Sequence, residues 1–238
     1  MWSSNFYKVD KLKTKINEWI VGKLLILVAW FTEKTGSWTL RPERDIEDDH
    51  YYAVRDYVRP LDVILSEVKG AVSNSYNISD INHAMLYLGI TEDKYRRDVV
   101  EAAGKGVVFR GLPSAMLSKD RIIICRPTFL TNAKSKDDLI DDAREIVDAH
   151  KGYDYKFTIE EEKKMTERKY YCFELVAVLL EKHFNVKLKR GEILGHKNIT
   201  SDAYNKSSDF VVIYDSDTHD ESMRNLEMNY RKVREGVI

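Results

Sequence analysis

The sequence is poor in the residues that build disulfide frameworks, metal clusters and flexible linkers. It has two cysteines, Cys125 and Cys172, and four prolines in 238 residues. Two cysteines exclude a disulfide-rich scaffold and fit a reducing compartment, although a single bridge stays open. The six histidines show no metal-site spacing and there is no cysteine pair, so we expect no structural zinc and no cofactor.

An excess of one charge and a membrane-spanning apolar run are also absent. The 38 Lys and Arg residues and the 39 Asp and Glu residues give a net charge of −1, so no overall field attracts nucleic acid. The most apolar window, 19–31, contains Lys23 and is shorter than the roughly 20 residues of a membrane span. No cleavage site of small residues follows this window. We therefore expect a cytoplasmic protein.

Periodicity predicts a helix at residues 7–33, where apolar side chains recur at steps of three and four. The second half of this segment is apolar on every side, which favours packing in the core or in a homo-oligomer. Contact with a membrane surface through the same segment is the less favoured alternative.

A β-rich region follows the N-terminal segment. We predict strands at 63–65, 83–89, 98–103, 107–109, 121–126 and 210–214. The polar loop 90–97 suits an antiparallel connection, and the apolar run 122–125 suits a central strand. Apolar spacing predicts a helix at 135–150, and we expect a polar, helical tail at 216–238. Without an internal repeat or a linker, the pattern predicts one α+β domain over residues 1–238.

Cys172 stands at the start of a helix-like apolar run, 171–180. The first backbone N–H groups of a helix have no helical partner, and together with the helix dipole they favour the thiolate, which is the nucleophilic form of cysteine. A nearby imidazole would act in the same direction, and His83 opens one of the predicted strands. Simple packing of a buried cysteine is the alternative reading of Cys172.

Strand alternation suggests a partner for this imidazole. If the predicted strands on either side of the loop 90–97 pair as a hairpin, Glu101 falls nearly opposite Met85 and diagonal to His83. Cys172, His83 and Glu101 can then supply the nucleophile, the base and the group that orients the base. A structural ion pair between Glu101 and a Lys or Arg residue is an equally good reading, because a carboxylate among apolar neighbours needs a partner.

Three tyrosines, Tyr153, Tyr155 and Tyr171, lie close to the predicted nucleophile in sequence. One of them could donate a hydroxyl to an oxyanion hole beside the backbone N–H of Cys172, with aromatic packing as the alternative. Cys125 lies inside an apolar strand with no helix terminus to activate it, so we expect an inert, buried thiol.

These pieces occur together in one known family. The chain resembles circularly permuted NlpC-type papain-like thiol hydrolases, in particular the YiiX-like branch with its bacterial and poxviral members. The similarity covers about residues 57–215 and is carried by the segments 59–66, 82–89, 99–102, 106–107, 153–154 and 171–176. Two positions depart from the family pattern, because Leu61 stands where a glycine is usual and Phe173 where a small serine usually follows the cysteine.

The resemblance implies a papain-like α+β fold in which an antiparallel β-sheet or barrel packs on a central helix that starts at Cys172, with 7–33 as an added helix. It implies Cys172 as nucleophile, His83 as base and Glu101 as orienting residue. We therefore expect a thiol hydrolase that cleaves a peptide or isopeptide bond through an acyl-enzyme intermediate. The alternatives are an acyltransferase or lipase-like enzyme on lipid acyl groups, and a catalytically silent binding or assembly protein of the same fold.

Overall fold

The computed structural model describes most of the chain after residue 45. The described residues are 46, 48–69, 81–89, 98–117, 119–129, 133–154, 157, 159, 162–193 and 196–234. The predicted helix at 7–33 lies outside these residues. Among the described helices, none is both long enough and apolar enough to cross a membrane.

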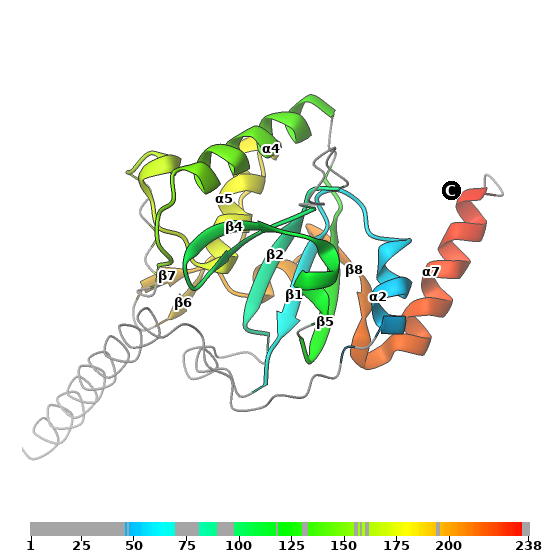
Figure 1. Cartoon of the computed structure of the whole chain (residues 1–238). Helices are drawn as coiled ribbons and strands as arrows, with labels where there is room; N and C mark the ends of the chain where they lie inside the picture. The colour runs from blue at the N-terminus through cyan, green and yellow to red at the C-terminus, as the bar shows by residue number, and fades with distance from the viewer. Residues whose placement is uncertain are drawn as a thin grey trace, which may run out of the picture.

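A six-stranded antiparallel sheet lies at the centre of the fold (Figure 1). Its strand order is β4-β3-β2-β1-β5-β8. The strands are β1 (Val63–Glu67), β2 (His83–Tyr87), β3 (Val99–Ala103), β4 (Gly106–Arg110), β5 (Arg121–Pro127) and β8 (Phe210–Asp215). Together with the helices described below, this sheet confirms the predicted α+β class and the predicted strands.

The apolar run in β5 illustrates why the strand assignments succeeded. β5 pairs with β1 on one side and with β8 on the other, and its residues Ile122 to Cys125 are buried. A strand with neighbours on both sides and helices over both faces needs apolar side chains in both directions. This confirms the prediction of an interior strand at 122–125.

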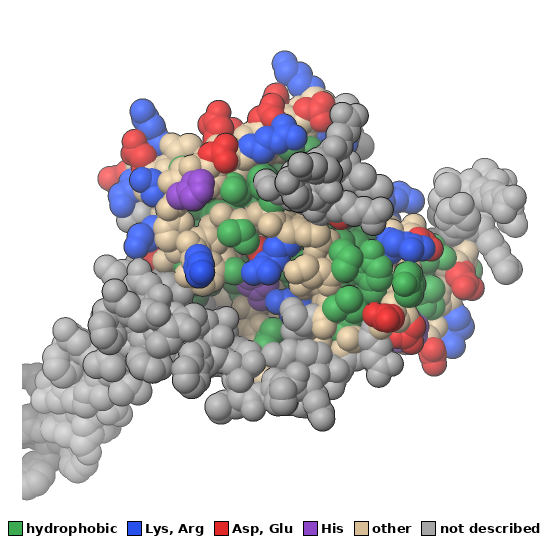
Figure 2. All heavy atoms as spheres, in the orientation of Figure 1, with side chains coloured by type: hydrophobic (Ala, Val, Ile, Leu, Met, Phe, Trp, Pro, Cys, Tyr) green, Lys and Arg blue, Asp and Glu red, His purple; other side chains and the backbone are tan. Residues whose placement is uncertain are grey.

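Helices cover both faces of the sheet and create two apolar clusters. On one face, α4 (Ala133–Asp148) and α5 (Cys172–Phe184) pack with alternate residues such as Leu65 and Leu86. On the other face lie α2 (Asp48–Arg55), α3 (Leu112–Met116) and α7 (His219–Arg234), around Met85 and its neighbours (Figure 1). The outer side of α4 carries mixed acidic and basic side chains, as expected for an amphipathic helix (Figure 2).

Several shorter elements and boundaries differ from the sequence predictions. The α2 helix was not predicted, and α4 begins at Ala133 instead of Ser135. α4 also ends at Asp148, because His150 adopts a left-handed conformation with φ 50° before Gly152 is reached. The remaining short elements were not predicted: α3, η2 (Met165–Glu167), β6 (Gly191–Ile193), β7 (His196–Asn198), α6 (Asp202–Asn205) and η3 (Ser216–Thr218).

The described part of the C-terminal tail is helical, as predicted, and it also packs on the sheet. α7 packs beside β8, and Leu226 is buried in the same cluster as Met85. Figure 1 shows this helix alongside the sheet edge formed by β8.

The unusual Leu61 has a structural explanation. Its φ angle is 77°, in the left-handed region that non-glycine residues avoid, while its side chain is buried in the core cluster with α5. The turn before β1 therefore requires the conformation that glycine adopts most easily. In this chain the apolar burial of a leucine offsets the backbone strain.

Candidate active site

Cys172 is the first residue of α5, and the fold brings it against the start of β2. The preceding Tyr171 has extended backbone angles and makes no side-chain cap to the helix, which leaves the first N–H groups of α5 without that partner. The Sγ atom of Cys172 lies 3.9 Å from the carbonyl oxygen of Asn82, one residue before His83. The thiol is free and 2 % exposed. This places the thiol at a helix N-terminus, as the sequence predicted.

The start of β2 is itself held in place by Asn82. Its side chain exchanges two hydrogen bonds with Val68, since Oδ1 accepts from the backbone N–H at 3.3 Å and Nδ2 donates to the carbonyl at 3.1 Å. The backbone N–H of Asn82 also donates to the carbonyl of Ser66. These bonds fix the end of β1 to the residue that precedes His83.

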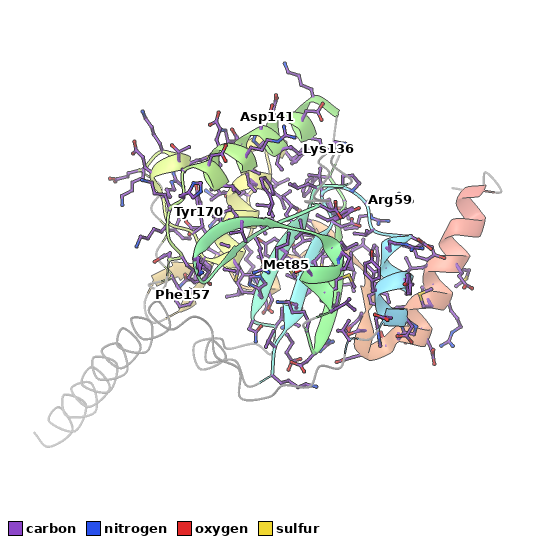
Figure 3. All side chains as sticks on the ribbon, in the orientation of Figure 1. Arg59, Met85, Lys136, Asp141, Phe157 and Tyr170 are labelled. Carbon is purple, nitrogen blue, oxygen red and sulfur yellow. The ribbon has the colours of Figure 1, made fainter. Side chains whose placement is uncertain are left out.

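The β2–β3 ladder sets the relation between His83 and Glu101. Glu101 pairs directly with Met85, which confirms the predicted register. Met85 lies near the middle of the sheet in Figure 3. As a diagonal neighbour, His83 places Nε2 at 2.6 Å from Oε2 of Glu101. The two side chains are 15 % and 4 % exposed, so little water competes for this hydrogen bond.

Glu101 has a second partner that the sequence did not reveal. The Nε atom of Arg110 donates a hydrogen bond to Oε1, the carboxylate oxygen that His83 does not use. Glu101 is therefore both a partner of His83 and a member of an ion pair with an arginine, the two alternatives that the sequence left open. The sequence did not identify Arg110 as this partner, because its proximity to Glu101 depends on the β3–β4 register, in which Arg110 pairs with Val99.

The protonation of this group follows from competing effects. Burial disfavours the charged form of His83, but the negative charge and hydrogen bond of Cys172, together with Glu101, raise the pKa of His83 to about 9. Burial likewise opposes ionisation of Glu101. The hydrogen bond and charge of His83, and then the charges of Lys119 and Arg110, lower the pKa of Glu101 to about 2.

The pKa of the Cys172 thiol shifts in the opposite direction to that of His83. Burial works against the thiolate, yet the charge and hydrogen bond of His83 lower the pKa of Cys172, with further help from the backbone N–H of Ala84 and the hydroxyl of Tyr153. A lowered thiol pKa beside a raised imidazole pKa favours a thiolate–imidazolium pair. Because Nε2 of His83 is engaged with Glu101, Nδ1 is the ring nitrogen left for Cys172.

The tyrosines near the thiol occupy different positions. Tyr153 forms a parallel β-bridge with Tyr170, and its hydroxyl lies 3.9 Å from Sγ of Cys172. Tyr171 is buried, and its hydroxyl accepts a hydrogen bond from the backbone N–H of Ile199 at 2.8 Å. Tyr155 lies outside the described residues. Of the two described candidates, Tyr153 is the one whose hydroxyl contacts the thiol.

Phe173, the bulky departure from the family pattern, packs into the core. It is 3 % exposed, and its ring stacks on Tyr204 with centroids 6.4 Å apart. The hydroxyl of Tyr204 also donates to the carbonyl of Phe173 at 2.7 Å. The extra volume is therefore taken up by an aromatic pair inside the fold.

Cys125, the second thiol, is fully buried in β5. Burial raises its pKa to about 12, with smaller contributions from the charges of Asp62 and Asp215. The pKa of Cys172 is therefore lowered and that of Cys125 raised, and the difference in reactivity predicted from their sequence surroundings stays a prediction.

Ligands for a metal ion do not converge in the described part of the chain. There, no group of three or more His, Cys, Asp and Glu side chains has a geometry that could hold a metal ion. His83 and Glu101 are already engaged with each other, with Cys172 and with Arg110.

Comparisons with known proteins agree with this fold. A solved structure, the metalloprotein YiiX from Escherichia coli O157:H7, is similar with a TM-score of 0.50 and 14 % sequence identity, over 66 % of this chain and 96 % of that chain. A search of curated proteins gives no match. A protein-family model for permuted papain-like amidase enzymes (YaeF/YiiX, C92 family) matches residues 57–230.

The family match reaches residue 230 and so includes most of α7, whereas the resemblance seen in the sequence ends at about residue 215. The family supports the predicted hydrolase activity on amide bonds. The chain belongs to the family of permuted papain-like amidases that includes YaeF and YiiX.

Proposed function

We propose that the chain is a thiol hydrolase that cleaves a peptide or isopeptide bond through an acyl-enzyme on Cys172. The observation that carries the proposal is the 2.6 Å hydrogen bond between Nε2 of His83 and Glu101, beside a thiol at the N-terminus of α5. A nucleophile, a base and a group that orients the base are the three parts that covalent acyl transfer requires.

The reaction begins from the thiolate of Cys172 and the imidazolium of His83. Sγ attacks the carbonyl carbon of the substrate amide, a C–S bond forms, and the carbonyl π electrons move to oxygen. When this tetrahedral intermediate collapses, the C–N bond breaks and His83 gives its proton to the leaving amine. The product is a thioester on Cys172 and a neutral His83.

Water completes the cycle by the reverse sequence of proton transfers. Neutral His83 accepts a proton from water as its oxygen attacks the thioester carbonyl. Collapse of the second intermediate breaks the C–S bond, releases the acid and restores the thiolate–imidazolium pair. Glu101 stays ionised throughout, because its role is to hold the imidazole and stabilise its charge.

The proposal assigns two donors to the negative oxygen of the tetrahedral intermediates. One is the backbone N–H of Cys172 at the start of α5, and the other is the hydroxyl of Tyr153, 3.9 Å from Sγ.

A metal ion has no step in this proposal, because the described residues that carry the chemistry do not form a ligand set. A cytoplasmic location and the absence of a nucleic-acid partner remain predictions from the sequence.

Mass spectrometry of the acyl-enzyme tests this proposal. The protein would be mixed with p-nitrophenyl acetate, quenched in acid and digested. We expect an acetyl group on the peptide that contains Cys172, a smaller yield in His83→Ala, and none at this position in Cys172→Ala. Acetylation of other residues alone, with Cys172 unmodified, would contradict the proposed nucleophile.

The choice of substrate needs a second comparison. We expect peptidyl and isopeptide amides of a fluorogenic amine to be hydrolysed, with loss of turnover in Cys172→Ala. Turnover of long-chain acyl esters without any amide turnover would favour the lipid-acyl alternative. A protein that takes up no acyl group from any donor would be a catalytically silent member of the family.

A further inference from the structure

A row of polar side chains crosses four neighbouring strands on one face of the sheet. Ser66 of β1 pairs directly with His83 of β2, Glu101 of β3 is a diagonal neighbour of His83, and Arg110 of β4 is a diagonal neighbour of Glu101. Directly paired residues share a face, so all four side chains start from the same side of the sheet. The proposed function uses only His83 and Glu101 from this row.

Arg110 lies at the end of the row, on the edge strand β4. Its side chain is 44 % exposed, whereas its partner Glu101 is 4 % exposed. The ion pair therefore connects a partly solvated cation to a buried carboxylate. An ion pair between two exposed side chains contributes little, but removing one partner of a buried charge leaves that charge poorly compensated.

The two oxygens of Glu101 bind different partners, and Arg110 therefore helps to fix the orientation of the carboxylate. Glu101 accepts from Arg110 at Oε1 and from His83 at Oε2, so both oxygens are held and the carboxylate plane cannot rotate away from the imidazole. The positive charge of Arg110, together with that of Lys119, favours the ionised form of Glu101. An ionised Glu101 cannot take the proton that His83 needs for the leaving amine.

We propose that Arg110 is a positioning residue that holds Glu101 in place and ionised, and that through Glu101 it maintains His83 as the cationic partner of Cys172. The inference rests on the proposed function, in which these three residues act as a triad. It goes beyond it by assigning a role to a fourth residue, one that touches neither the thiol nor the imidazole in the described contacts.

The test measures ionisation of Cys172 directly, without a substrate. Iodoacetamide labelling rates of Cys172 would be followed by peptide mass spectrometry over a pH series for the wild type, Arg110→Met, Arg110→Lys, Glu101→Gln and the double variant. Arg126→Met is the matched control, because Arg126 forms hydrogen bonds of 2.9 and 2.7 Å with the equally buried Asp62 at the opposite end of β1.

The expected result is a shift of the labelling profile to higher pH in Arg110→Met. Near pH 6 we expect labelling of Cys172 to slow by about three- to tenfold, because the thiolate loses part of its cationic partner. Arg110→Lys should retain much of the wild-type rate, since it keeps the charge. Arg126→Met should lower the melting temperature and leave the profile in place, which separates a structural effect from a positioning effect.

The double variant decides whether Arg110 acts through Glu101. If it does, Arg110→Met adds little once Glu101→Gln is present, because coupled residues are not additive. An Arg110→Met profile that superimposes on the wild type, or a full additional shift in the double variant, would overturn the inference. Failure of the proposed function can be distinguished from failure of this inference. If the proposed function is wrong, His83→Ala would also leave the pH profile of Cys172 labelling unchanged.

Discussion

His83 and Glu101 meet through a hydrogen bond of 2.6 Å across neighbouring strands, although 18 residues separate them along the chain. The contact exists because Glu101 pairs with Met85, two residues from His83 on the same face of β2. A shift of this register by one residue would turn Glu101 to the opposite face of the sheet. The register of one hairpin therefore determines whether His83 has this carboxylate partner.

The first prediction concerns stability as a function of pH. The pKa of His83 is raised from 6.5 to about 9, so its contribution to folding is complete below 6.5 and is lost as the pH rises through about 9. The pKa of Glu101 is lowered from 4.5 to about 2, so its contribution is complete above 4.5 and is lost as the pH falls toward 2. We expect this pair to stabilise the fold most between about pH 4.5 and 6.5.

Urea unfolding across this pH range would measure the effect. Glu101→Gln should flatten the decline on the acid side, because the variant has no carboxylate left to protonate. The control is Asp141→Asn, which removes an exposed partner of Arg144 and should follow the wild-type curve. An acid-side decline of the same size in Glu101→Gln would show that other carboxylates cause it.

The second prediction separates Tyr153 and Tyr171, the two described candidates for the oxyanion hole. Tyr153→Phe removes the hydroxyl that lies 3.9 Å from Sγ, so we expect acylation to slow by about ten- to a hundredfold with little loss of stability. Tyr171→Phe removes the acceptor of the Ile199 N–H hydrogen bond, so we expect a loss of about 1–2 kcal/mol of stability and a nearly unchanged acylation rate. Single-turnover acylation and urea unfolding of both variants test this, and equal behaviour of the two would contradict it.

The third prediction concerns the strained backbone at Leu61. Both Leu61→Ala and Leu61→Gly lose a buried side chain, at a cost of about 2–5 kcal/mol. Glycine also relieves the strain of a φ angle of 77°, so we expect Leu61→Gly to be the more stable variant by about 1 kcal/mol. This reverses the usual order of alanine and glycine. Measured free energies of unfolding in which Leu61→Ala equals or exceeds Leu61→Gly would show that the turn carries no such strain.

The strands and the β2–β3 register were predictable because their signals are local. Alternation, the polar loop 90–97 and the doubly apolar run in β5 each reflect burial that repeats along a few residues. The β6–β7 hairpin was missed because its strands, Gly191–Ile193 and His196–Asn198, are too short to show a period. α2 was missed because its charged first turn continues the charge pattern of the preceding residues.

The candidate site was predictable only in part. Cys172, His83 and Glu101 stood out because each has an unusual residue type for its local pattern. Arg110 did not, since an arginine at the end of a strand is common and its relation to Glu101 arises from pairing between β3 and β4. The position of Tyr153 likewise depends on its bridge to Tyr170, a tertiary contact that sequence distance alone does not specify.

The most direct test of the account is the pH dependence of thiol labelling, with Cys125 as an internal reference. In the folded wild type, Cys172 should react with iodoacetamide well below pH 8.5, the value for an unperturbed cysteine, because His83 favours the thiolate. Cys125 should stay unlabelled until the protein is unfolded, since it is buried and its pKa is raised to about 12.

Replacing His83 by alanine then isolates the central claim. We expect the Cys172 profile to move toward higher pH in His83→Ala, by more than in Glu101→Gln, while Cys125 stays protected in both variants. Equal and slow labelling of the two cysteines in the wild type, with no change in His83→Ala, would mean that Cys172 is a packing residue and would contradict the proposed thiol hydrolase.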